Sequence, residues 1–272
     1  MPAEKPDLQE GPASATAPCP LHEANRRRWD AGARGYAERG DRRGVWRRCA
    51  HEPELVFDPK ELAWLRDVAG KRVCVLGSGD NEAVFALAGL GALVTSVDIS
   101  EAQLEVAAER ARQLGLAVTF LRADVCDLTA LADGAFDLVY TGGHVNVWVS
   151  DVRRYYAEAA RILVPDGLLM VSEYHPFRRG WRETKERLER ACGYFERGPH
   201  EYDCSGEISG AAPGSLPTYE FHWTVGDCVM AVKAAGCDIE LVDEFGDEPE
   251  EWECAALTGL PRILLIIGRK QR

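Results

Sequence analysis

The sequence predicts an α/β protein with a mostly parallel sheet covered by helices on both faces. Short apolar runs alternate with amphipathic helical segments from about residue 60 onward. The run 73–76 passes directly into the turn Gly77-Ser78-Gly79, and the next run, 93–97, ends on Asp98. Short apolar runs are typical of strands buried on both faces, and their alternation with helices favours parallel pairing.

Composition narrows the class of protein. The 272 residues suffice for one large core, and a formal net charge of −12 disfavours general binding to nucleic acid or anionic membranes. No apolar run is long enough to predict a membrane span. Nine cysteines without a repeated C-x-x-C pattern favour free thiols and a cytoplasmic location.

The N-terminal part precedes this alternation and has a different composition. Residues 1–20 are rich in Pro and Ala and are expected to form a disordered leader. Residues 21–58 are rich in arginine, with Trp29, Tyr36 and Trp46 among the arginines. This segment is either a solvated helical face whose aromatic rings dock on the core, or a helical cap that closes over a ligand. We expect residues 21–272 to form a single domain.

Residues 71–100 form a strand, turn, helix and strand that predict a nucleoside cofactor. The glycines of the turn let a ligand approach the backbone, and Asp98 is placed to accept hydrogen bonds from ribose hydroxyls. A dinucleotide motif would have glycine where Glu82 stands, and its pyrophosphate would meet Asp80 and Glu82. S-adenosylmethionine carries a sulfonium and an ammonium group, so the acidic residues favour it. The alternative is an NAD-linked oxidoreductase.

The remaining elements follow in order. A short helix is expected over 59–68, and Ser100 with Gln103 predicts a capping box before a helix that reaches residue 114. Strands are expected at 118–121, 136–140, 168–171, 238–245 and 263–267, and helices at 150–163 and 225–235. Residues 177–222 interrupt the alternation with a polar stretch, which we expect to be an insertion that covers a substrate.

These motifs resemble the class I S-adenosylmethionine-dependent methyltransferase family over about residues 60–176. The resemblance rests on the turn Val75–Gly79, on Asp98, on Asp124 in RADV, and on the stretch Arg161–Gly167 before the fifth strand. It implies a Rossmann-like seven-stranded sheet whose last strand, near 262–268, is antiparallel. It also implies S-adenosylmethionine as cofactor and methyl transfer to a small molecule.

The turn departs from the family pattern at two positions. Val75 stands where the family usually has an acid, and Asn81 where it usually has a third glycine. Asp80 or Asn81 could supply the missing polar contact. The expected cofactor-binding residues are those at the carboxyl ends of the strands: Gly77, Ser78, Gly79, Asn81, Asp98, Ile99, Asp124, Val125 and Tyr140.

Four residues are candidates for contact with the methyl acceptor. His144 and His175 follow strands that lead to the cleft, so we expect one of them to act as a base or to orient the acceptor. Tyr174 and His222 are expected to bind the substrate. No H-x-H or H-x-x-x-H spacing is present, so we expect no metal.

Several alternatives stay open at this point. The acceptor atom could be oxygen, nitrogen, sulfur or carbon, and the protein could be a monomer or a homodimer. A role in bacterial specialised metabolism is consistent with the composition. The fold alone also allows a non-catalytic protein that binds the cofactor.

Overall fold

The computed structural model describes residues 9–10, 19–181, 187–205, 208, 211–246 and 257–272. Most of the predicted leader, residues 1–20, therefore lies outside the described residues. The exceptions are Gln9–Glu10, which form the short strand β1 beside β4, and the start of the first helix at Pro20. No helix in these ranges is long and apolar enough to cross a membrane.

The main sheet confirms the predicted α/β architecture. Its strands lie in the order β1-β4-β3-β2-β5-β6-β10-β9, so seven longer strands are joined by the two-residue β1. Strands β1 to β6 pair in parallel, whereas β10 runs antiparallel to both β6 and β9, as predicted for the last strand. The strands not yet bounded are β2 (Arg72–Leu76), β3 (Leu93–Asp98), β4 (Val118–Arg122), β5 (Phe136–Gly142), β6 (Leu163–Tyr174), β9 (Cys237–Phe245) and β10 (Ile263–Lys270).

Helices cover both faces of this sheet because successive strand residues point in opposite directions. In β2, Cys74 and Leu76 join the core beneath α5 (Val152–Arg161) and α6 (Val225–Ala234). Val73 and Val75 join the core beneath α3 (Glu82–Gly89) and α4 (Glu101–Leu114). The predicted helix 59–68 is shorter than expected: α2 spans only Pro59–Leu62.

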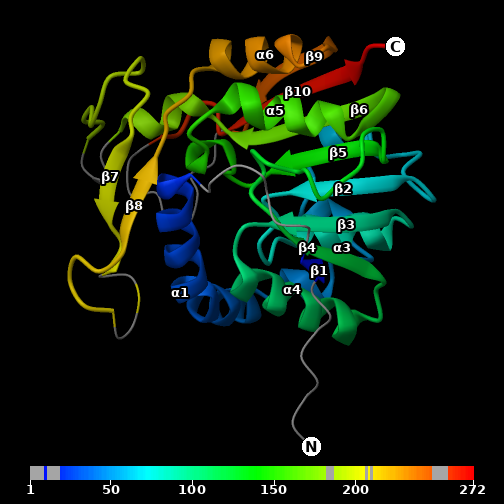
Figure 1. Ribbon diagram of the computed structural model, residues 1–272, viewed down its shortest axis with the longest axis horizontal. Coiled ribbons are helices and arrows are strands. Elements are labelled where there is room, and N and C mark those ends of the chain that lie inside the picture. The colour runs from blue at the N-terminus through cyan, green and yellow to red at the C-terminus, as the bar shows by residue number, and fades with distance from the viewer. Residues whose placement is uncertain (1–8, 11–18, 182–186, 206–207, 209–210, 247–256) are drawn as a thin grey trace, which may run out of the picture.

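The carboxyl ends of the parallel strands meet a separate layer. Helix α1 (Pro20–Arg43) stands against this edge, and the hairpin of β7 (His200–Asp203) and β8 (Pro217–Glu220) lies beside α1 (Figure 1). The predicted insertion thus contains a hairpin as well as loops. The described residues also form four short 3-10 helices: η1 (Val45–Arg47), η2 (Pro53–Leu55), η3 (Asn146–Trp148) and η4 (Pro176–Gly180).

Candidate functional site

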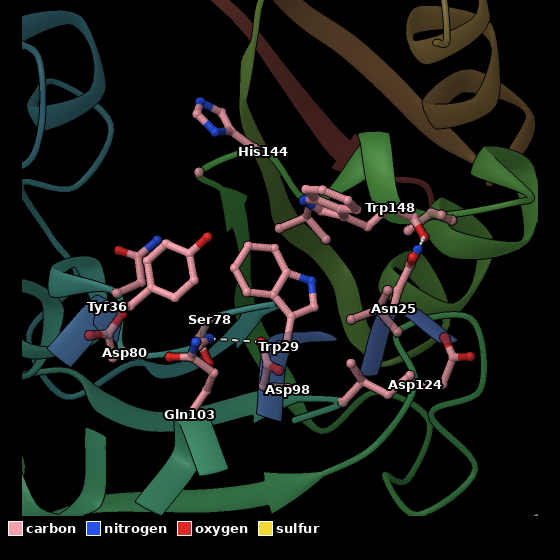
Figure 2. Close-up of a pocket in the computed structure, with 18 of the residues that line it drawn as sticks. Asn25, Trp29, Tyr36, Ser78, Asp80, Asp98, Gln103, Asp124, His144 and Trp148 are labelled. Atoms are coloured by element: carbon pink, nitrogen blue, oxygen red, sulfur yellow. Dashed lines mark hydrogen bonds between the residues drawn. The ribbon is translucent and has the colours of Figure 1, made fainter. Parts of the chain in front are cut away.

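A cavity of about 300 Å³ lies where α1 faces the carboxyl ends of β2, β3, β4 and β5. Both the glycine turn and α1 contribute to its wall, and Figure 2 shows Trp29 between Asp98 at one end and His144 at another. The lining comprises His22, Asn25, Trp29, Tyr36, Gly77, Ser78, Gly79, Asp80, Asn81, Glu82, Asp98, Ile99, Gln103, Asp124, Val125, Gly143, His144, Val145, Trp148 and Val149.

The turn after β2 presents backbone to the cavity. Gly77 has a φ of +60°, and a Cβ atom there would lie 2.6 Å from the Val145 side chain. The Ser78 hydroxyl turns inward instead and lies 2.6 Å from the hydroxyl of Ser96. At the start of α3, Asn81 Oδ1 accepts a hydrogen bond from the amide of Ala83 at 2.7 Å. Only glycine fits the first position, because it tolerates both the positive φ and the close contact.

Asp98 and Gln103 place oxygen acceptors side by side at the end of β3. Asp98 is buried, and its two carboxylate oxygens accept hydrogen bonds from the amides of Gly79 and Ser100, each at 2.7 Å. Burial raises the pKa of Asp98 to about 6. Gln103 Oε1 is also buried, and no described residue donates a hydrogen bond to it. A buried acceptor without a partner is costly, so this oxygen is suited to a ligand hydroxyl.

Only one of the two hydrogen bonds of the predicted capping box at α4 is present. Ser100 Oγ accepts from the amide of Gln103 at 3.2 Å, as a cap does. The Gln103 side chain does not return to the cap and instead lines the cavity. Ser100 Oγ donates to Asp30 of α1 at 2.6 Å, so the same residue also holds α1.

Helix α1 is fastened over the cavity by polar contacts at both ends. Near its start, His22 Nδ1 lies 2.6 Å from Asp124 Oδ2. Burial alone would lower the pKa of His22, but the hydrogen bond and charge of Asp124 outweigh it and raise that pKa. Near its end, Arg110 of α4 donates to the Ala37 carbonyl at 2.9 Å and to Asp80 of the turn at 2.7 Å. These contacts hold α1 over the cavity, and we call α1 the cap; that residues 21–58 close over a ligand stays a prediction.

His144, which follows β5, also lines the cavity. His144 has a φ of +75°, and its ring packs edge-on against Tyr174 at 4.6 Å between centroids. Burial lowers the pKa of His144 to about 3. The imidazole is therefore neutral at physiological pH and can donate or accept a hydrogen bond.

Four predicted site residues do not line this cavity. Tyr140 points to the opposite face of the sheet, where its hydroxyl donates to Glu61 at 3.2 Å, so its side chain is wrongly predicted to contact the cofactor. His175 caps η4 and pairs with Glu244 of β9 at 2.6 Å, a geometry that favours a structural role. Tyr174 lies behind His144, and His222 lies at the hairpin.

Comparisons with known proteins give the same family as the motifs. A family model described as a methyltransferase domain matches residues 74–171. A methyltransferase structure from Mesorhizobium loti, described as S-adenosylmethionine dependent, superimposes with a TM-score of 0.59 at 26% identity, covering 78% of this chain and 96% of that one. Residues 74–171 thus match a methyltransferase domain, and the fold is similar to that of an S-adenosylmethionine-dependent methyltransferase. The predicted family and its cofactor are thereby confirmed.

Curated relatives match a smaller share of this chain. A ubiquinone biosynthesis O-methyltransferase of Thiobacillus denitrificans is 29% identical over 154 residues, which cover 56% of this chain and 66% of that protein. An uncharacterised methyltransferase of Bacillus subtilis is 32% identical over 118 residues, covering 43% and 45%. The chain spans just under two thirds of the first two curated relatives it matches.

The cavity of this methyltransferase fits S-adenosylmethionine. Asp98 and Gln103 would accept from the ribose hydroxyls, and no phosphate has to approach the acidic residues of the turn. Trp29, Tyr36 and Trp148 line the cavity with aromatic rings, a kind of surface that attracts cations, and the Arg28 guanidinium already lies over all three. Eight of the nine predicted cofactor residues line the cavity, Tyr140 being the exception.

Sequence reasoning missed several residues of this wall. His22, Asn25 and Trp148 were not predicted as site residues, and Gln103 was assigned only to a cap. Of these, only Gln103 had a usable signal, because it follows the ribose acid by little more than one helical turn.

Proposed function

We propose that this protein transfers the methyl group of S-adenosylmethionine to a small-molecule acceptor bound at the His144 end of the cavity. The proposal rests on the cap, which is helix α1. Helix α1 is tied to both sides of the carboxyl edge, through His22 to Asp124 and through Ala37 to Arg110. A macromolecular acceptor would have to displace this helix, whereas a small molecule can be enclosed beneath it.

The chain's own residues supply binding, orientation and exclusion of water. When bound, the cofactor supplies a sulfonium that is already an activated methyl donor. Asp98 and Gln103 would fix its ribose, and the rings of Trp29 and Trp148 would keep water away from the reacting groups. Much of the rate would then come from holding the acceptor in line with the methyl group.

The environment of His144 favours one of its two predicted roles. A general base is most effective when its pKa is near the working pH, and burial leaves the pKa of His144 at about 3. We therefore assign His144 to orienting the acceptor by a hydrogen bond. This assignment favours acceptors that are nucleophilic without a strong protein base.

The names of the curated relatives suggest a first class of acceptor. Several are called ubiquinone biosynthesis O-methyltransferases, so small hydroxylated aromatic compounds are the acceptors to test first. An NAD-linked reaction is disfavoured by Asp80 and Glu82, which line the cavity where a pyrophosphate would lie. The described cysteines are all free thiols, which supports a cytoplasmic location.

The proposal is tested with purified protein, S-adenosylmethionine labelled in the methyl group, and a panel of small phenols, amines, thiols and carbon acids. Transfer of label to at least one acceptor, with formation of S-adenosylhomocysteine, is the expected result. Tight binding of the cofactor without transfer to any member of the panel would favour the non-catalytic alternative. Preferential binding of NAD would contradict the proposal.

A further inference from the structure

The polar insertion brings a cysteine and two histidines together outside the cavity. Cys192 precedes the β7–β8 hairpin, His200 begins β7, and His222 follows β8. One ligand atom from each of the three side chains lies within 4.8 Å of the other two. Their spacing along the chain matches no short metal motif, because the hairpin and not a local turn brings them together.

Each of the two histidines has a hydrogen-bond acceptor beside its Nε2 atom. His200 Nε2 lies 3.0 Å from the carbonyl oxygen of Glu196, which can only accept a hydrogen bond. His222 Nε2 lies 3.3 Å from the Glu220 carboxylate. Both rings therefore carry their proton on Nε2, which leaves the lone pair on Nδ1. Metal-binding histidines usually donate their second N–H to a carboxylate or backbone carbonyl in this way.

The distances fit a tetrahedral ion. Cys192 Sγ and His222 Nδ1 are 3.5 Å apart. Zinc bonds of about 2.3 Å to sulfur and about 2.05 Å to nitrogen, at a tetrahedral angle, separate the two ligand atoms by ~3.5 Å. The rings of His200 and His222 stack at 4.0 Å between centroids with 21° between their planes, so one ring has to rotate before both Nδ1 lone pairs can point at the same ion.

We propose that Cys192 Sγ, His200 Nδ1 and His222 Nδ1 bind one Zn²⁺ ion, with the fourth position taken by water or another ligand. A thiolate with two imidazoles is a donor set that zinc prefers. Binding removes the proton of the Cys192 thiol and forms the Zn–S bond, so one proton is released for each ion bound.

A zinc ion at this site would support helix α1 through the hairpin. The hairpin that it would fasten holds the cap, because the backbone amide and carbonyl of Tyr219 in β8 each bond the Asn25 side chain of α1 at 2.8 Å. Zinc would tie three segments of the insertion together and so support α1. The zinc proposal rests on the hairpin alone and does not depend on the methyl acceptor.

The test is a metal titration of the full chain after treatment with a chelator. We expect one zinc per chain by elemental analysis, release of one proton per zinc, and a thiolate-to-cobalt charge-transfer band when Co²⁺ is used as the probe. Cys192→Ser and His200→Asn should each weaken zinc binding at least about 100-fold. Cys204→Ser is the matched control, because Cys204 is a free cysteine of the same insertion outside the cluster.

Circular dichroism and titration with S-adenosylhomocysteine establish that each variant is folded. The proposal is overturned if the wild-type protein binds no zinc at micromolar concentration, or if folded Cys192→Ser and His200→Asn bind it as tightly as wild type. It is also overturned if Co²⁺ binds without the thiolate band. Loss of binding in Cys204→Ser as well would place the site elsewhere and contradict the assignment.

Discussion

His22 and Asp124 join the cap to the sheet through a partly buried hydrogen bond of 2.6 Å between Nδ1 and Oδ2. The other ring nitrogen of His22, Nε2, accepts from the amide of Ser150 at 2.9 Å. Asp124 is thus both one of the acids on which the family resemblance rests and an anchor of α1. The position of the cap and the shape of the cofactor site are set by the same carboxylate.

His22→Ala should loosen the cap. A hydrogen bond to a charged group contributes about 1.5–3 kcal/mol, so we expect Tm to fall by roughly 3–6 °C. Cofactor affinity should fall as well, because α1 carries part of the cavity wall. Differential scanning fluorimetry with and without S-adenosylhomocysteine measures both effects. His51→Ala removes an exposed histidine and should change neither. A His22→Ala protein with unchanged Tm and affinity would contradict this role.

Gln103→Met separates ligand binding from stability. The buried Oε1 lacks a partner among the described residues, so replacing the amide by an apolar side chain should leave Tm of the free protein unchanged or higher. Affinity for S-adenosylmethionine should drop about 5–30-fold through loss of the ribose acceptor. Gln113→Met, at an exposed position of the same helix, is the control. Equal affinities for the two variants would remove Gln103 from the site.

Glu173 gives the protein a predictable pH dependence. It is fully buried, Oε1 accepts from Thr141 Oγ1 at 3.1 Å, and burial raises its pKa from 4.5 to about 7. Because the folded state holds this proton more tightly, the contribution of Glu173 to stability falls as pH rises from about 4.5 to 7. Ionisation costs on the order of 3 kcal/mol by pH 8.

Glu173→Gln should remove this cost, because the amide keeps the Oε1 acceptor without a charge. We expect the free energy of unfolding at pH 8 to rise by up to about 3 kcal/mol, with little change at pH 4. Urea denaturation at several pH values measures the difference. A variant that is less stable than wild type at pH 8 would show that the ionised carboxylate is needed for the fold.

His144→Asn should lower kcat about tenfold or more while leaving affinity for S-adenosylmethionine within about twofold, because His144 is assigned to the acceptor. With its pKa at about 3, His144 should contribute no ionisation to the kcat profile between about pH 5.5 and 8. His175→Asn should instead lower Tm, since His175 pairs with Glu244. A kcat ionisation near 6.5 that disappears in His144→Asn would identify this residue as a base.

The strands of the sheet were predictable because each depends on a local sequence pattern. The direction of each strand side chain depends on the register of its strand, which that pattern does not give. Tyr140 and Thr141 are adjacent at the end of β5, and the pleat sends them to opposite faces. The sequence near the Gly142-Gly143 bend does not show which face leads to the cavity. His175 likewise ends a strand near the cleft, yet the antiparallel β9 brings Glu244 to it, and that contact joins distant segments.

The cap was predictable only as one of two alternatives, for a physical reason. Helix α1 packs against a cavity lined by polar groups, so its buried residues include His22, Asn25 and Arg28 instead of an apolar stripe. Periodicity of apolar residues is the usual signal for the buried face of a helix, and here it is weak. Contacts such as His22 with Asp124 become visible only when the strands are assembled.

Calorimetric titration with S-adenosylhomocysteine, on wild type and Asp98→Ala, tests the central claim most directly. We predict micromolar binding by wild type above about pH 6, weaker binding below it as Asp98 takes up a proton, and at least about tenfold loss in Asp98→Ala. The cofactor favours the ionised carboxylate, so affinity should rise with pH and then level off. Absence of wild-type binding at millimolar ligand, or equal binding by Asp98→Ala, would contradict the assignment of this cavity to the cofactor.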